Sequence, residues 1–144
     1  MRILAFGLSL AAMVVAFTYS ALAYTCTPTG GCTFNVQYVE PGTLTNGQPL
    51  TDLSGTTITY TIAVDGGTPS APKTVTVPAS RPSGGGAIDR VITEAGLVPP
   101  HTYTISATAT ATSTAYGTSA ATAVGQKVMN HGVTPQPPGA LTIQ

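Results

Sequence analysis

A strict two-residue alternation is the feature that most constrains the fold of this chain. From residue 102 to residue 109 a hydroxyl residue and an apolar residue follow each other without a break, the apolar set being Tyr103, Ile105, Ala107 and Ala109. A period of two is that of a β-strand with one buried face and one solvated face. Two prolines, at 99 and 100, precede the run and are typical of a turn. The stretch therefore predicts a long, half-buried strand.

The same alternation recurs along the rest of the chain. Runs rich in Gly, Pro and Asn separate the alternating segments and predict turns between them. No segment beyond the N-terminal leader has the i, i+3, i+4, i+7 spacing of an amphipathic helix. About seven strands without helices predict an all-β sandwich or barrel. Besides the run above, which continues to 114, strands are expected over 33–39, 56–64, 73–77, 87–93 and 119–124.

The N-terminal residues have the pattern of an export signal. Arg2 is followed by an almost wholly apolar run from residue 3 to 18, and then by Ala21-Leu22-Ala23, a small-x-small cleavage pattern. A transmembrane anchor is the competing interpretation, but the apolar run is short for a bilayer and no basic stop follows it. We predict a signal peptide over 1–23 and a secreted or extracellular protein, with the cell surface and the periplasm both open.

Charge and chemistry exclude several function classes. Charged residues make up 7% of the chain and the formal net charge is zero, so no basic surface is expected for nucleic acid, and no membrane partner is expected after leader cleavage. The only histidines, His101 and His131, and the scattered acids lack the spacing of a metal motif. No nucleophile motif such as Gly-x-Ser-x-Gly occurs. We expect no catalytic residues, no cofactor and no metal.

The two cysteines, Cys26 and Cys32, enclose five residues just after the predicted cleavage site. Export favours a disulfide between them. A metal pair and a redox pair are the alternatives, although a metal site needs more than two ligands and redox motifs usually have closer spacing. A bridge over so short a loop is expected to fix the N-terminal strand more than to stabilise the whole fold.

Several segments resemble a fibronectin type III domain of secreted bacterial proteins. The segment 97–103, which begins at Leu97 and ends at Tyr103, resembles the tyrosine corner of that family, and 57–62 resembles its third strand with Tyr60. The resemblance implies a seven-stranded antiparallel β-sandwich, immunoglobulin-like, over residues 24–125. It also implies that the Tyr103 hydroxyl bonds to the backbone near the preceding crossover.

The chain departs from the family in its expected core. It contains no Trp, and Tyr38 stands where the family's core Trp is expected. Because Tyr has less area to bury than Trp, and because small residues occupy 107–111, we expect a light core and modest stability. Tyr38, Tyr60, Leu97 and Tyr103 are therefore the residues to which we assign structural roles.

The function expected of this protein is binding to another surface rather than catalysis. We expect a non-enzymatic structural or adhesion module that binds a protein or glycan surface, or itself, through the loops 46–52, 78–86 and 113–118 or through a sheet edge. The alternative is a carbohydrate- or polymer-binding accessory protein of a secreted hydrolase, for which only Tyr24 and Tyr116 are expected to be exposed aromatic contacts. A self-assembling surface appendage or filament is the third hypothesis.

The C-terminal segment 126–144 reads as a Pro-rich tail that contains an unpaired strand. Two interpretations stay open: a disordered tail, or a strand that pairs with the exposed sheet edge of a neighbouring molecule. The candidate assembly strand consists of Ala140, Leu141, Thr142, Ile143 and Gln144.

Overall fold

The computed structural model describes residues 24–27 and 30–132 of the chain. Among these residues no helix is long and apolar enough to cross a membrane. The predicted signal peptide 1–23 and the candidate assembly strand 140–144 lie outside the described residues. The strands are β1 (Tyr24–Cys26), β2 (Cys32–Val39), β3 (Leu53–Val64), β4 (Lys73–Pro78), β5 (Ala87–Glu94), β6 (His101–Ser113), β7 (Gly117–Thr118) and β8 (Thr122–His131).

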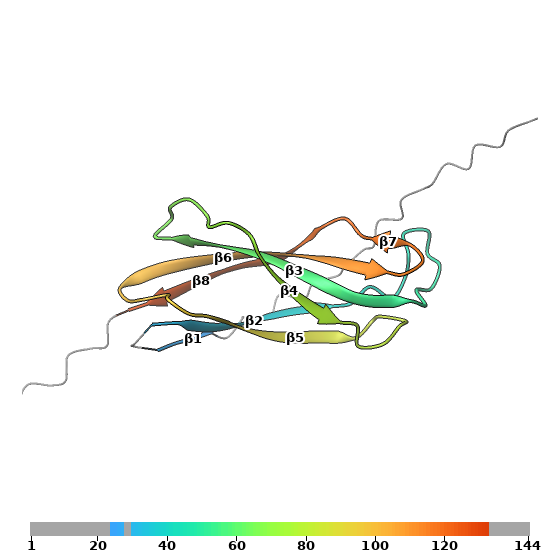
Figure 1. Ribbon diagram of the computed structural model, residues 1–144, viewed down its shortest axis with the longest axis horizontal. Coiled ribbons are helices and arrows are strands. Elements are labelled where there is room, and N and C mark those ends of the chain that lie inside the picture. The colour runs from blue at the N-terminus through green and yellow to red at the C-terminus, as the bar shows by residue number, and fades with distance from the viewer. Residues whose placement is uncertain (1–23, 28–29, 133–144) are drawn as a thin grey trace, which may run out of the picture.

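The strands form two antiparallel sheets that pack face to face (Figure 1). One sheet has the order β1-β2-β5, and the other has the order β4-β3-β6, with β7 and β8 both paired to β6. Because β7 and β8 are two parts of one edge strand, the sandwich has seven strands divided three and four. This confirms the all-β, immunoglobulin-like antiparallel sandwich that the sequence predicted.

The core lies between the sheets and follows from the alternation of each strand. β2 alternates buried and half-buried residues from end to end, and β6 does the same beyond its first two residues. Phe34 and Tyr60 meet across the core edge to face, with ring centroids 5.8 Å apart. Beside Tyr60 in the same sheet, three small residues of β6, Ala107, Ala109 and Ala111, are also buried. The fully buried side chains include Phe34, Val36, Leu50, Ile58 and Met129.

The last strand corrects the sequence analysis. β8 pairs with β6 as far as the partners His101 and His131, and Met129 and His131 are both buried, so the predicted strand end at 124 and domain boundary at 125 are wrong. The residues 126–131 belong to the sandwich rather than to a tail. The alternation continues there, but Lys127 and His131 occupy its inward positions, and polar residues at core positions conceal a strand in a sequence.

Candidate functional site

A disulfide joins Cys26 and Cys32 in the structure. Their Cα atoms are 4.1 Å apart, and the two residues are direct partners in the pairing of β1 with β2. Thr27 completes the hairpin, because its N–H donates to the carbonyl of Gly31 at 3.0 Å. The bridge expected from the sequence therefore fastens the short first strand to the sheet.

The tyrosine at the start of β6 ties the turn before it to the sandwich. Tyr103 Oη donates a 2.7 Å hydrogen bond to the carbonyl oxygen of Val98. Leu97 is buried beside it in the core. These two residues fix the path of the chain between β5 and β6.

Two other tyrosines have contrasting surroundings. Tyr60 donates from its hydroxyl to the buried carboxylate of Glu94, which also accepts a hydrogen bond from Lys73. Burial raises the pKa of Tyr60, and the bond to Glu94 adds to the effect. Tyr38 Oη, in contrast, is buried without a hydrogen-bond partner among the described residues. Burial raises the pKa of Tyr38 too, the neighbouring Thr56 hydroxyl lowers it, and the Glu40 carboxylate raises it further.

The three loops predicted to bind partners lie together at one end of the sandwich (Figure 1). The Asp52 carboxylate joins the first and third loops, because it accepts hydrogen bonds from Ser113 Oγ at 2.8 Å and from the N–H of Ala115 at 2.5 Å. The N–H of Leu53 donates to the carbonyl of Pro82 in the second loop at 2.8 Å. The tip of the first loop, residues 45–49, is exposed.

A buried carboxylate holds the second of these loops. Glu40, which is 2% exposed, accepts a 2.8 Å hydrogen bond from the N–H of Ser80 and another from its hydroxyl. Gly84 in this loop has φ 58° and lies against Pro41, which follows β2. A Cβ at position 84 would stand 1.9 Å from the carbonyl oxygen of Pro41. Only glycine fits there, which explains one residue of the glycine run.

Hydroxyl side chains cover the outer face of the sheet that contains β4, β3 and β6. Cross-strand pairs set hydroxyl residues side by side on it: Thr59 faces Thr108, and Thr57 faces Thr110. On the other side of β3, Thr59 faces Thr74. We call this surface the hydroxyl face. It consists of Thr74 and Thr76 on β4, Thr57, Thr59 and Thr61 on β3, and Thr104, Ser106, Thr108, Thr110 and Thr112 on β6.

The spacing of the hydroxyl face is fixed by sheet geometry. Neighbouring strands are about 4.8 Å apart, and successive outward side chains of one strand are about 6.8 Å apart. The Thr108 and Thr110 hydroxyls make only long hydrogen bonds of 3.4 Å, to the carbonyls of Thr59 and Thr57. Both hydroxyls therefore keep much of their hydrogen-bonding capacity for a partner.

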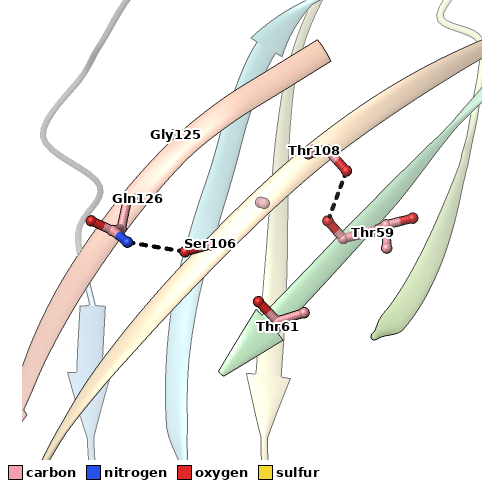
Figure 2. Close-up of a pocket in the computed structure, with 7 residues that line it drawn as sticks. Thr59, Thr61, Ser106, Thr108, Gly125 and Gln126 are labelled. Carbon is pink, nitrogen blue, oxygen red and sulfur yellow. Dashed lines mark hydrogen bonds between the residues drawn. The ribbon is translucent and has the colours of Figure 1, made fainter. Parts of the chain in front are cut away.

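A shallow depression of about 650 Å³ lies within this face, between β3, β6 and β8 (Figure 2). The register of β8 against β6 shifts between Ala107 and Thr108, and Gly125, which lines the depression next to the shift, has φ 142°. Gln126 borders the depression and donates from Nε2 to Ser106 Oγ at 3.1 Å. The lining residues include Thr59, Thr61, Ser106, Thr108, Gly125 and Gln126.

The hydroxyl face carries no charge. Lys127, on the neighbouring strand β8, is the cross-strand partner of Ile105, whose side chain points inward. The Lys127 ammonium lies 5.4 Å from the centre of the Tyr24 ring. The nearest carboxylate along β3, that of Asp65, lies past the strand end, where it accepts hydrogen bonds from the N–H of Thr102 and from His101. The Thr102 N–H, and then His101, lower the pKa of Asp65.

Sequence reasoning did not single out the hydroxyl face. Its signal is present, because threonines recur at every second position of three predicted strands. The sequence does not state which strands are neighbours or in which register they pair, so it could not show that these threonines share one surface. The two aromatic residues that it did single out, Tyr24 and Tyr116, are 36% and 54% exposed and lie away from this face.

Comparisons with known proteins give a likeness among solved structures. No family model matches the chain, and no curated protein matches it. Among solved structures, the solution structure of the third fibronectin III domain of the human KIAA0343 protein is similar, with 13% sequence identity, coverage of 97% of this chain and 98% of that chain, and a TM-score of 0.43.

Proposed function

We propose that this protein is a non-enzymatic, secreted adhesion or structural module that contacts an uncharged, hydroxyl-rich surface, such as a glycan, through its hydroxyl face. The observation that carries the proposal is the register of three neighbouring strands, which sets threonine beside threonine with no charged residue between them. The disulfide supports secretion, because such bridges persist in oxidising compartments.

The chemistry of the face suits a neutral polymer. Each threonine hydroxyl can donate one hydrogen bond and accept two, and its methyl group offers apolar contact. A glycan presents hydroxyls and C–H groups in the same alternation. Because neither surface is charged, their contact would depend little on salt. An extended sheet face suits a long or layered ligand, and the depression at Gly125 would take a group that projects from it.

Co-sedimentation of the exported protein with a panel of insoluble polysaccharides tests this proposal. The face variant is Thr59→Glu with Thr108→Lys, a cross-strand pair in which opposite charges replace two hydroxyls without repelling each other. The matched control is Thr33→Glu with Thr93→Lys, a cross-strand pair on the outer face of the other sheet.

We expect at least one polysaccharide to retain the unmodified protein and the control equally, with retention unchanged in 1 M salt. The face variant should be retained at least tenfold more weakly, although it melts at the same temperature. If the face variant and the control are retained alike, or if salt releases the protein, the hydroxyl face is not the contact surface.

Self-association by strand addition is a second candidate function. Among the described strands β4 hydrogen-bonds to β3 alone, so its outer edge is open to another strand. The residues Ala140 to Gln144 would supply that strand to a neighbouring molecule and build a filament or appendage. Deletion of residues 134–144 should then reduce the mass measured by light scattering to that of a monomer. An unchanged mass in a self-associating protein would exclude this role of the tail.

A further inference from the structure

His131 lies against the disulfide although the three residues come from different strands. A ring nitrogen of His131 and the Sγ atoms of Cys26 and Cys32 all lie within 4.8 Å of one another. The cysteines are on β1 and β2, and His131 ends β8, so the fold and not sequence spacing brings them together. Cys32 and His131 are 0% and 4% exposed.

The hydrogen bonds of His131 fix which ring nitrogen is free. Its Nε2 is 2.9 Å from the carbonyl oxygen of Thr27, which can only accept, so Nε2 carries the proton of the neutral ring. The lone pair is then on Nδ1, which is buried and has no hydrogen-bond partner among the described residues. A buried acceptor without a donor is costly and rare. Histidine ligands of metals have this arrangement, with one nitrogen held by a carbonyl and the other at the metal.

We propose that the reduced form of this protein binds a thiophilic cation of the Zn²⁺ class through Cys26, Cys32 and His131. The two thiolates and Nδ1 would supply three ligands, and water would complete the tetrahedron. Thiolates bound at 2.3 Å in a tetrahedral zinc site are about 3.8 Å apart, so the two sulfurs separate once the bridge is reduced, and a ring nitrogen of His131 lies within 4.8 Å of both of them in the bridged form. The sequence alone offered two ligands, and the fold supplies the third.

The chemistry makes the metal and the disulfide mutually exclusive. A reductant such as a dithiol transfers two electrons and two protons to the Cys26–Cys32 bridge and is itself oxidised to a disulfide. Zn²⁺ then displaces the two thiol protons and binds the thiolates, while neutral His131 contributes Nδ1 without losing a proton. The bound site is neutral overall and still fastens β1 to β2 and β8. Exchange with an external disulfide, which takes up the two electrons and leaves as two thiolates, would form the Cys26–Cys32 bridge again and release the cation.

Metal titration of the full exported protein tests the proposal. The protein is reduced with a phosphine, kept without oxygen, and titrated with Zn²⁺ against a chromophoric chelator. Co²⁺ serves as the spectroscopic probe, because thiolate ligation gives a charge-transfer band in the near ultraviolet. The variant is His131→Ala, and the control is His101→Ala, which removes the cross-strand partner of His131 outside the cluster.

We expect one Zn²⁺ per reduced chain, a thiolate-to-cobalt band, and no binding to the oxidised chain. His131→Ala should weaken Zn²⁺ binding at least tenfold, and His101→Ala should leave it within twofold. Equal affinities of His131→Ala and the unmodified protein, one Zn²⁺ per two chains, or equal binding by the oxidised chain would overturn the proposal. If His131→Ala does not fold, His131→Gln gives the same decision, because it keeps a side chain of similar length but removes the imidazole nitrogen, and it should likewise weaken Zn²⁺ binding at least tenfold.

Discussion

Tyr103 Oη and the carbonyl oxygen of Val98 are joined by a 2.7 Å hydrogen bond across the turn that leads into β6. Tyr103→Phe removes the hydroxyl without changing the ring that fills the core. We expect it to lower the free energy of unfolding by about 1–2 kcal/mol, since the bond is lost and the carbonyl loses its partner. Urea denaturation followed by circular dichroism measures the change.

Tyr38→Phe makes the same chemical change as Tyr103→Phe, but at a tyrosine whose hydroxyl makes no hydrogen bond to the described residues. The Tyr38 hydroxyl is buried without a hydrogen-bond partner in the described part of the chain, so its removal relieves a desolvated group. We expect Tyr38→Phe to change the unfolding free energy by no more than about 0.5 kcal/mol, or to raise it. Should Tyr38→Phe destabilise the protein as much as Tyr103→Phe does, the Tyr38 hydroxyl has a partner after all.

Glu40 is predicted to hold the loop 78–86 in place. Glu40→Gln keeps one acceptor oxygen for the Ser80 N–H but places an NH2 group against the Ser80 hydroxyl, so that bond must reverse its direction, and both bonds lose the negative charge of the acceptor. We expect a loss of about 2 kcal/mol of stability and faster cleavage by proteinase K, a protease of broad specificity, within the loop 78–86. The control is Asp89→Asn, an exposed carboxylate on β5 that the side-chain amides of β2 contact.

The control Asp89→Asn should change the free energy of unfolding by no more than about 0.5 kcal/mol. It should leave the rate of cleavage in the loop unchanged. Limited proteolysis followed by mass spectrometry reports the cleavage site. Equal cleavage of the two variants by proteinase K within the loop 78–86 would show that the buried carboxylate does not restrain the loop.

Asp65 makes stability depend on acid pH. Its pKa is lowered in the folded protein, first by the N–H of Thr102 and then by His101, so the folded state favours the ionised form. The resulting stabilisation is present above the unfolded pKa of 3.8 and is lost as the pH falls through the lower folded value. The stability difference between the unmodified protein and Asp65→Asn should therefore shrink below pH 4.

Asp65→Asn is a suitable probe because Asp65 has φ 49°, a conformation that Asn adopts readily. Thermal unfolding of both proteins between pH 2 and pH 7 gives the measurement. A difference that stays constant over this range would mean that Asp65 ionises equally well in the folded and unfolded chains.

The disulfide should contribute modestly to stability. It closes a short loop, with a sequence separation of 6, for which chain entropy predicts about 2 kcal/mol. We expect the double variant Cys26→Ala with Cys32→Ala to lose about that amount and to keep the rest of the sandwich. Hydrogen exchange should show lost protection in β1 alone. Loss of protection throughout both sheets would mean that the bridge supports the whole fold.

The fold was predictable where alternation and burial agree. β2 has apolar residues at its inward positions from Phe34 to Tyr38, and β6 has them from Tyr103 to Ala111, and a two-residue period leaves little ambiguity. β8 was cut short because Lys127 and His131 stand at inward positions, the first beside the Tyr24 ring and the second beside the disulfide. Polar side chains at such inward positions are stabilised by contacts with residues distant in the chain, and a sequence does not show these contacts.

The candidate sites were less predictable than the fold for one physical reason. The disulfide was within reach because Cys26 and Cys32 are close in the chain, but Thr59 and Thr108 are brought together only by the pairing of β3 with β6. His131 and Cys26 come from opposite ends of the domain. Both the hydroxyl face and the cluster of Cys26, Cys32 and His131 are created by the pairing and register of strands that are distant in the chain. The local sequence pattern does not show which strands pair or in which register.

Backbone amide shifts measured by NMR test the central claim most directly. The labelled protein is titrated with a soluble fragment of the polysaccharide that retains it. We predict shifts on β3, β4 and β6, centred on Thr59 and Thr108, with 1 M salt leaving them unchanged and with the amides of β2 and β5 unaffected. Shifts confined to the loops 46–52 and 113–118, or to β2 and β5, would contradict a hydroxyl face that makes the contact.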